Sequence, residues 1–170
     1  MSFEVKVSNV DETLAPGEDP ERAAIRLAQA KAMAVAATDP RPVLAADTLV
    51  LCDGRILGKP VSAPDAADML RLLSGRAHEV VTGVCLVSGG VPRAALERTT
   101  VHFAPLSEAD IAWYVATDEP LDKAGAYHVD GRGSLFITGI AGSPSNVAGL
   151  PVRTVLALAR EAGLDLGISR

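Results

Sequence analysis

The pattern of apolar and polar positions predicts a strand followed by a helix in the first forty residues. Apolar side chains alternate with polar ones over residues 3–8, which is the period of a half-buried strand. An Asp-Pro-Glu sequence at 19–21 then supplies an N-cap, a proline at the first helical position and an early acid. Residues 23–37 follow without a break until Asp39-Pro40. The sequence therefore predicts a helix that ends at this Asp-Pro pair.

The next forty residues predict a central strand and a second helix. Residues 43–51 form an apolar run, interrupted by one acid and one threonine, that is short and β-branched and so favours a buried strand. Asp53-Gly54 indicates a turn. A Ser-Ala-Pro-Asp sequence at 62–65 resembles a capping box, and the helix that it begins is expected to end at Ser74-Gly75.

The second half of the chain predicts two strands joined through a glycine pair, and two further helices. The strands cover residues 79–87 and 98–103, with Gly89-Gly90 between them. The helices cover about 107–117, after a serine cap, and about 151–163, with short strands before the last one.

This order of elements predicts an α/β fold with a mixed, twisted β-sheet flanked by helices. The 170 residues are 48% hydrophobic, which is enough for one packed core, so we expect a single domain over residues 1–170. The net charge of −5 argues against duplex nucleic acid or an anionic membrane as the main partner. Cys52 and Cys85 lie in apolar runs without metal-ligand spacing, and no run of residues is long and apolar enough for a membrane span. We expect buried thiols and a cytoplasmic protein.

Lysine is rare in this chain, and its positions are informative. Four lysines stand against twelve arginines, and Lys31, Lys59 and Lys123 lie among Gly, Ala, Asp or Pro residues. A lysine ammonium is a compact charge that can follow a phosphate oxygen, whereas the arginine fork imposes planar geometry. We therefore expect these three lysines to converge on one phosphate-binding cleft; ordinary surface charge is the alternative.

Acidic residues supply the other candidates. Asp47 lies within an apolar strand, where a carboxylate must be paired, bound to metal or shifted in pKa, and the apolar run continues past it, which disfavours a simple turn cap. Asp11 and Glu12 offer hard oxygen ligands for Mg²⁺ or belong to a solvated loop. Residues 118–127 combine three acids, a lysine and a glycine, which favours a site loop. Residues 143–146 could hold an anion, but an ordinary helix cap is favoured.

Other chemistries lack support in the sequence. His78, His102 and His128 flank no G-x-S-x-G or H-E-x-x-H motif, so we interpret them as structural. No P-loop motif is present. The remaining acids and lysines suit metal-assisted attack of water on a phosphate ester.

Eight short blocks extend this interpretation. They are Val10-Asp11-Glu12, Leu27-Ala28-Gln29-Ala30-Lys31-Ala32, Ala46-Asp47-Thr48, Gly58-Lys59-Pro60, Leu73-Ser74-Gly75-Arg76-Ala77-His78, Thr82-Gly83-Val84, Glu119-Pro120-Leu121-Asp122-Lys123-Ala124-Gly125-Ala126-Tyr127 and Asn146-Val147-Ala148-Gly149-Leu150-Pro151. In these blocks, and in their order, the chain resembles the Maf-like nucleoside triphosphate pyrophosphatases essentially from end to end.

The resemblance implies hydrolysis of a nucleoside triphosphate to the monophosphate and pyrophosphate, with Mg²⁺ or Mn²⁺, by a cytoplasmic homodimer. It implies that Asp47 is the proton acceptor and Thr48 a specificity position. The other polar residues expected in the site are Lys31, Lys59, Lys123, Asp11 and Glu12. From the residues alone, Asp47 could equally join Asp11 and Glu12 as a metal ligand.

Two departures from the family pattern bear on the substrate. Family members carry a Ser-x-Ser-Pro-Arg-Arg turn upstream of Asp11-Glu12, and this chain starts after it; we expect triphosphate to bind at least about tenfold more weakly than to a form with that turn. Asp130, a candidate substrate contact, stands where the subgroup acting on dTTP and UTP has glutamine. The expected substrate is dTTP, UTP or a modified nucleotide; the alternative is a non-catalytic nucleotide-binding or cell-division regulatory protein.

Overall fold

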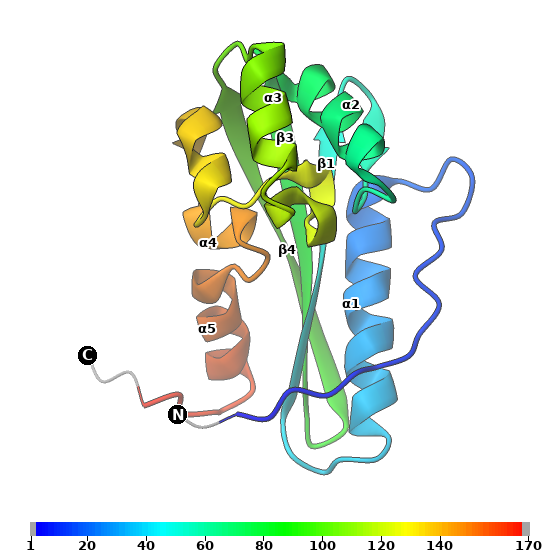
Figure 1. The fold of residues 1–170 in the computed structure, drawn as a ribbon. Coiled ribbons are helices and arrows are strands. Elements are labelled where there is room, and N and C mark those ends of the chain that lie inside the picture. The colour runs from blue at the N-terminus through cyan, green and yellow to red at the C-terminus, as the bar shows by residue number, and fades with distance from the viewer. Residues whose placement is uncertain (1–2, 168–170) are drawn as a thin grey trace. The chain divides into compact units, whose positions relative to one another are not determined.

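The computed structural model describes residues 3–167, which form helices and a five-stranded sheet (Figure 1). The strands follow the order β2-β1-β3-β4-β5 across the sheet. Strand β2 pairs antiparallel with β1, and β5 pairs antiparallel with β4. The bounds of the strands are β1 Val43–Cys52, β2 Arg55–Leu57, β3 Ala77–Ser88, β4 Val91–Phe103 and β5 Ile137–Ala141.

Each of the four predicted helices is present, so the α/β class with a sheet flanked by helices is confirmed. The α-helices are α1 Pro20–Ala36, α2 Ala63–Leu73, α3 Glu108–Val115, α4 Pro144–Val147 and α5 Val152–Glu161, and the 3-10 helices are η1 Glu119–Asp122, η2 Ala124–Ala126 and η3 Arg132–Phe136. The predicted caps Asp19, Ser62 and Ser107 each accept a hydrogen bond from the backbone N–H three residues on. These bonds satisfy groups that the first helical turn leaves unpaired.

The chain divides into two compact units, each made of separate segments. Unit 1 comprises Met1–Asp47, Thr82–Glu97 and Gly149–Arg170, and unit 2 comprises Thr48–Val81 and Arg98–Ala148. The single domain expected over residues 1–170 stays a prediction.

The predicted strand at residues 3–8 is wrong. This segment belongs to no strand, and its apolar side chains, on Phe3, Val5 and Val7, are 81–83% exposed. Its polar side chains instead hold it to the rest of unit 1, because Lys6 donates to Asp39 at 2.7 Å and Arg41 donates to Glu4 at 2.7 Å. Apolar and polar side chains do alternate in this segment, but the polar side chains are the ones that contact the rest of unit 1. Side-chain ion pairs here take the place of a backbone ladder.

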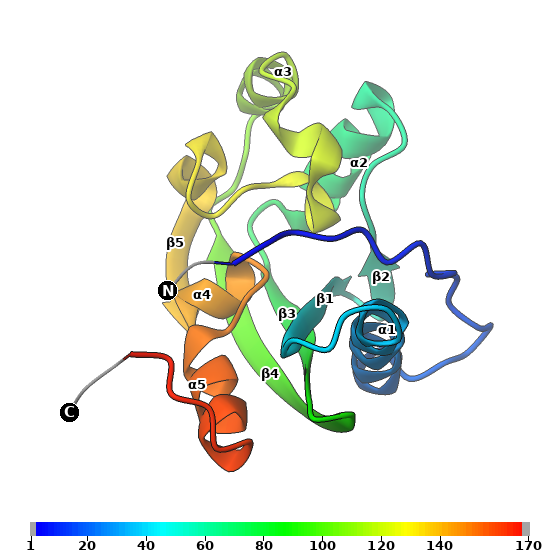
Figure 2. The ribbon, with the colours of Figure 1, turned by 90° about the horizontal axis from the view of Figure 1, so that it is seen from below.

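In unit 1, successive residues of β3 point to two different helices. Cys85 and Val87 pack in one cluster with α1, whereas Val84 and Leu86 pack in another with α5. The two-residue period of a strand places alternate side chains on opposite faces. Helices α1 and α5 therefore cover opposite faces of β3, as Figure 2 shows.

Gly83 brings α1 unusually close to β3. A Cβ built on Gly83 would lie 2.2 Å from the carbonyl oxygen of Ala24, which belongs to α1. A distance this short leaves no room for any side chain. The glycine thus fixes the helix that carries Lys31 directly against the strand.

Unit 2 has its own core, which includes a buried histidine. His78 is 2% exposed, its Nε2 lies 2.8 Å from the hydroxyl oxygen of Tyr127, and its ring meets that of Phe103 edge-on at 5.0 Å. Burial lowers the pKa of His78 to about 4, and the nearby charge of His102 adds to this. The structural role expected for His78 is confirmed.

Both cysteines are free and buried, as expected for Cys52 and Cys85. Among the helices of the described residues, none has the length and apolar character needed to cross a membrane.

Candidate active site

Lys31 lies between two carboxylates of unit 1. Its Nζ is 2.6 Å from Oδ1 of Asp47 and 2.9 Å from Oε2 of Glu12. The side chains of Asp47 and Lys31 are 8% and 18% exposed, whereas that of Glu12 is 58% exposed. The group therefore has a buried acid, a half-buried cation and an acid facing solvent.

The fold places Asp47 opposite Lys31 through the strand period. Val43 and Ala45 of β1 pack in the cluster that also contains Ala28 of α1. Asp47 follows Ala45 by two residues, so its side chain continues on the same face of the strand. The carboxylate thus meets α1 close to Lys31.

Burial and charge compete in this group. Burial raises the pKa of Asp47, and the hydrogen bond from Lys31 opposes that rise. For Lys31, burial works against the ammonium, but the bonds to Asp47 and Glu12 outweigh it and raise the pKa of Lys31. Lys31 therefore remains charged, and the carboxylate of Asp47 is more basic than that of a solvent-exposed aspartate.

Asp11 and Glu12 have different surroundings although they are neighbours. Oδ1 of Asp11 accepts from the backbone N–H of Thr13 at 2.9 Å, and hydrogen bonding with Thr13 lowers the pKa of Asp11. Asp11 therefore turns toward its own loop, whereas Glu12 reaches Lys31. No group of three or more His, Cys, Asp or Glu side chains within residues 3–167 could hold a metal ion.

Two other candidate lysines lie on neighbouring loops of unit 2. The backbone N–H of Gly125 donates to the carbonyl oxygen of Gly58 at 3.0 Å, which joins the loop of Lys59 to that of Lys123. Asp122 accepts from Lys123 at 2.7 Å, which lowers its pKa, and the charge of Lys59 adds to the effect. Lys59 and Lys123 thus share one acidic neighbour. Their convergence with Lys31, which belongs to unit 1, stays a prediction.

The remaining two candidates, Thr48 and Asp130, also belong to unit 2. Thr48 follows Asp47 directly on β1 and is half-buried. Asp130 is exposed in the turn that precedes η3.

A half-buried anchor that the sequence analysis missed, Glu119, holds the turn of Asp130. Glu119 accepts from the backbone N–H groups of Arg132 and Gly133 at 3.2 and 3.1 Å, and from the hydroxyl of Tyr114 at 2.9 Å. Only the acidic character of residues 118–127 pointed toward Glu119 in the sequence. The hydrogen-bond partners of Glu119 belong to two other segments, so the spacing of residues along the chain could not predict them.

The cap interpretation of residues 143–146 is confirmed. Ser143 is the N-cap of α4, and its hydroxyl accepts from the backbone N–H of Asn146. The side chain of Asn146 is itself buried and donates to the carbonyl oxygen of Val80 at 3.0 Å. This segment therefore has a structural role in unit 2.

Comparison with known proteins connects these residues to a family. A family model described as "Maf-like protein" matches residues 1–162. A dTTP/UTP pyrophosphatase of Anaeromyxobacter sp. (strain Fw109-5) is 49% identical over 98% of this chain and 82% of the relative, and one of Koribacter versatilis is 47% identical over 96% and 86%. A crystal structure of a nucleoside-triphosphatase / dITP/XTP pyrophosphatase from Mycobacterium abscessus is 16% identical, with a TM-score of 0.41 over 92% of this chain and 77% of that one. The extent of the family match and the identity to these relatives show that the chain is a member of the Maf-like protein family.

Proposed function

We propose that this chain is a nucleoside triphosphate pyrophosphatase that converts dTTP or UTP to the monophosphate and pyrophosphate. The observation that carries the proposal is Lys31, whose ammonium bridges buried Asp47 and solvent-facing Glu12. The relatives at 47–49% identity with this chain are named dTTP/UTP pyrophosphatases, which supports the choice of substrate.

In the proposed reaction, water attacks the α-phosphorus of the triphosphate. The bond between the α-phosphorus and the oxygen bridging to the β-phosphorus breaks, and pyrophosphate leaves. Asp47 takes a proton from the attacking water, for which its raised pKa makes it a better base. Lys31 offsets phosphate charge and keeps Asp47 ionised before the attack.

Glu12 and Asp47 have the donor chemistry for a divalent cation. Mg²⁺ usually binds one or two carboxylates together with substrate phosphates, so a site of two carboxylates suits it. When bound, Mg²⁺ or Mn²⁺ would supply charge stabilisation at the phosphoryl oxygens. Asp47 could serve as ligand in place of base, and the third ligand expected, Asp11, is directed to Thr13 in this structure.

We assign phosphate contacts to Lys59 and Lys123 and base or sugar contacts to Thr48 and Asp130. The support for the lysines is their shared position beside Asp122. For Asp130 it is the exposed turn that Glu119 anchors. We further propose that the protein acts in the cytoplasm as a homodimer, without a nucleic-acid or membrane partner, in keeping with its net charge of −5.

The test of this function is the Asp47→Asn variant, which preserves shape and removes the charge. We expect turnover of dTTP, measured as pyrophosphate release with Mg²⁺, to fall by about 10²-fold or more. Asp68→Asn, at a side chain that is 75% exposed, is the matched control and should keep full turnover. Unchanged turnover in Asp47→Asn would remove Asp47 from the site. Triphosphate binding without pyrophosphate release by the unaltered chain would favour the non-catalytic alternative.

A further inference from the structure

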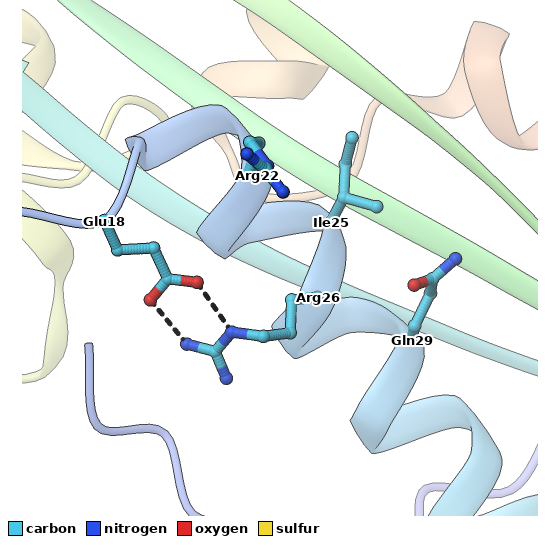
Figure 3. A pocket seen from close by; sticks show the side chains of 5 residues that line it. All are labelled: Glu18, Arg22, Ile25, Arg26 and Gln29. Atoms are coloured by element: carbon cyan, nitrogen blue, oxygen red, sulfur yellow. Dashed lines mark hydrogen bonds and ion pairs between the residues drawn. The ribbon is translucent and has the colours of Figure 1, made fainter. Parts of the chain in front are cut away.

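Arg26 and Glu18 form a two-pronged ion pair at the start of α1 in unit 1. Nε of Arg26 lies 2.7 Å from Oε1 of Glu18, and Nη2 lies 2.8 Å from Oε2 (Figure 3). Both side chains line a shallow pocket with a volume of about 260 Å³, together with Arg22, Ile25 and Gln29. Parallel bonds of this kind fix the orientation of both side chains, and they lower the pKa of Glu18 to about 2.

The same pair also holds the backbone of residues 13–18, which we call the 13–18 loop. Nη2 of Arg26 donates to the carbonyl oxygen of Thr13 at 3.3 Å. Oε2 of Glu18 accepts from the backbone N–H of Ala15 at 3.1 Å. The loop is thus hydrogen-bonded to the pair at Thr13 and at Ala15, and it ends at Glu18, which is itself part of the pair.

Thr13 directly follows Glu12 in the sequence. The Arg26–Glu18 pair, which binds Thr13, can therefore affect the position of Glu12 as well as the stability of the fold. Glu12 lies in a segment without regular secondary structure, and its side chain is 58% exposed where it contacts Lys31. An exposed ion pair of this kind is weak unless the backbone on either side is already ordered. The bond from Arg26 supplies that order one residue away.

Arg26 also lies within electrostatic range of the site. Its hydrogen bonds to Glu18 raise the pKa of Arg26, and the charges of Asp11 and Asp47 add to this increase. Arg26 and Lys31 both belong to α1, so the loop and the site are held by one rigid helix.

We infer that Arg26 and Glu18 are positioning residues, which hold the 13–18 loop so that Glu12 stays against Lys31 and Asp47. The effect of Arg26 and Glu18 on catalysis rests on the proposed function of Glu12 and Asp47. The inference goes beyond that function because neither residue is expected to touch the substrate.

The first measurement uses Arg26→Met and Glu18→Gln in the full chain. Each variant should lower kcat/KM for dTTP by about tenfold, which corresponds to about 1.4 kcal/mol. Each should also raise the Mg²⁺ concentration for half-maximal turnover. Calorimetric titration of Mn²⁺, with a non-hydrolysable thymidine triphosphate analogue present, should show binding weakened by about tenfold without relying on turnover.

Arg71 offers a matched control in unit 2. Its Nε and Nη2 bind Glu108 at 2.9 and 2.7 Å, in the same two-pronged arrangement, on the surface of α2 and α3. Arg71→Met should change the melting temperature about as much as Arg26→Met and leave Mn²⁺ affinity unchanged. If Arg26→Met also leaves Mn²⁺ affinity unchanged, the pair is merely structural and the inference is overturned.

A double-mutant cycle that combines Arg26→Met with Glu12→Gln tests whether Arg26 affects Mn²⁺ affinity through Glu12. If Arg26 acts through Glu12, Arg26→Met should cause no further loss of Mn²⁺ affinity in the Glu12→Gln chain, whereas independent sites give additive losses. Additive losses, or no loss from Glu12→Gln alone, would overturn the inference. The proposed function fails separately, through unchanged turnover in Asp47→Asn, so the two failures are distinguishable.

Discussion

Asp47 and Lys31 show why a single residue in this site is difficult to test cleanly. Asp47 is 8% exposed, and a buried carboxylate that loses its partner is strongly destabilised. Removing Lys31 would therefore combine a loss of activity with a loss of stability. Substituting Asp47 by asparagine lessens that problem, because a neutral amide needs no counter-charge and Lys31 keeps its ion pair with Glu12.

At the same scale, His78 makes the stability of the protein depend on pH. Its folded-state pKa of about 4 lies below the ordinary value of 6.5, so the unfolded chain binds a proton first as the pH falls. The contribution of neutral His78 is complete above pH 6.5 and is lost as the pH falls toward 4. Between pH 7 and pH 5 we expect the free energy of unfolding to fall by about 2 kcal/mol from this residue alone.

Urea unfolding at the two pH values, for the unaltered chain and His78→Gln, measures this loss as a difference, so that the titration of other groups cancels. His102→Gln is the comparison variant and should lessen the pH dependence only slightly, because burial, and not the nearby charge of His102, is the larger cause of the lowered pKa of His78. An identical pH dependence in His78→Gln and the unaltered chain would contradict the assignment.

At the scale of elements, the contact between α1 and β3 depends on the absence of one side chain. In Gly83→Ala the new Cβ would meet backbone atoms of α1 at 2.2–2.6 Å, and backbone cannot rotate away as a side chain can. The helix must shift, so we expect a loss of about 1–3 kcal/mol in the free energy of unfolding, measured by urea denaturation. Turnover should fall too, because Lys31 moves with α1.

Gly58→Ala is a suitable comparison for this experiment. A Cβ on Gly58 would meet nothing within 4 Å, and the backbone there does not require glycine, so its stability should change little. A Gly83→Ala chain as stable as Gly58→Ala would show that α1 can adapt to the added methyl group.

At the scale of the whole molecule, the scarcity of lysine allows a reactivity map. The described residues contain Lys6, Lys31, Lys59 and Lys123, and only the neutral form of a lysine amine attacks an acylating reagent. Lys31 should react slowest, because it is 18% exposed and its pKa is raised, whereas exposed Lys59 should react fastest. Mass spectrometry of briefly acetylated protein checks the order, and early modification of Lys31 would contradict the ion pairs described for it.

The parts of this molecule that depend on local sequence were predictable, and those that depend on distant partners were not. The caps at Asp19, Ser62 and Ser107 identified three helices because a cap needs only the next three residues. The apolar run at 43–51 identified β1 for a similar reason. Asp47 was a good candidate because its burial could be inferred from its neighbours.

The strand predicted at residues 3–8 was wrong because an alternating pattern shows only that a segment has an apolar and a polar face. It does not show which part of the protein contacts either face. The contact of Arg26 with Glu18 was not predicted, and only the family resemblance placed Glu12 and Lys31 in one site. Each of these two contacts joins α1 to a segment without periodic structure, where the distance along the chain carries no information about distance in space.

The exposed apolar side chains of residues 3–8 affect how the protein behaves in concentrated solution. At pH 7 the net charge of −5 keeps molecules apart, but this repulsion vanishes near the isoelectric point of about 5.2. There, three outward apolar side chains on an extended segment are free to meet their counterparts on other molecules, and sulfate salts strengthen such contacts. Colloidal stability should therefore be greatest in buffers well above the isoelectric point that lack sulfate.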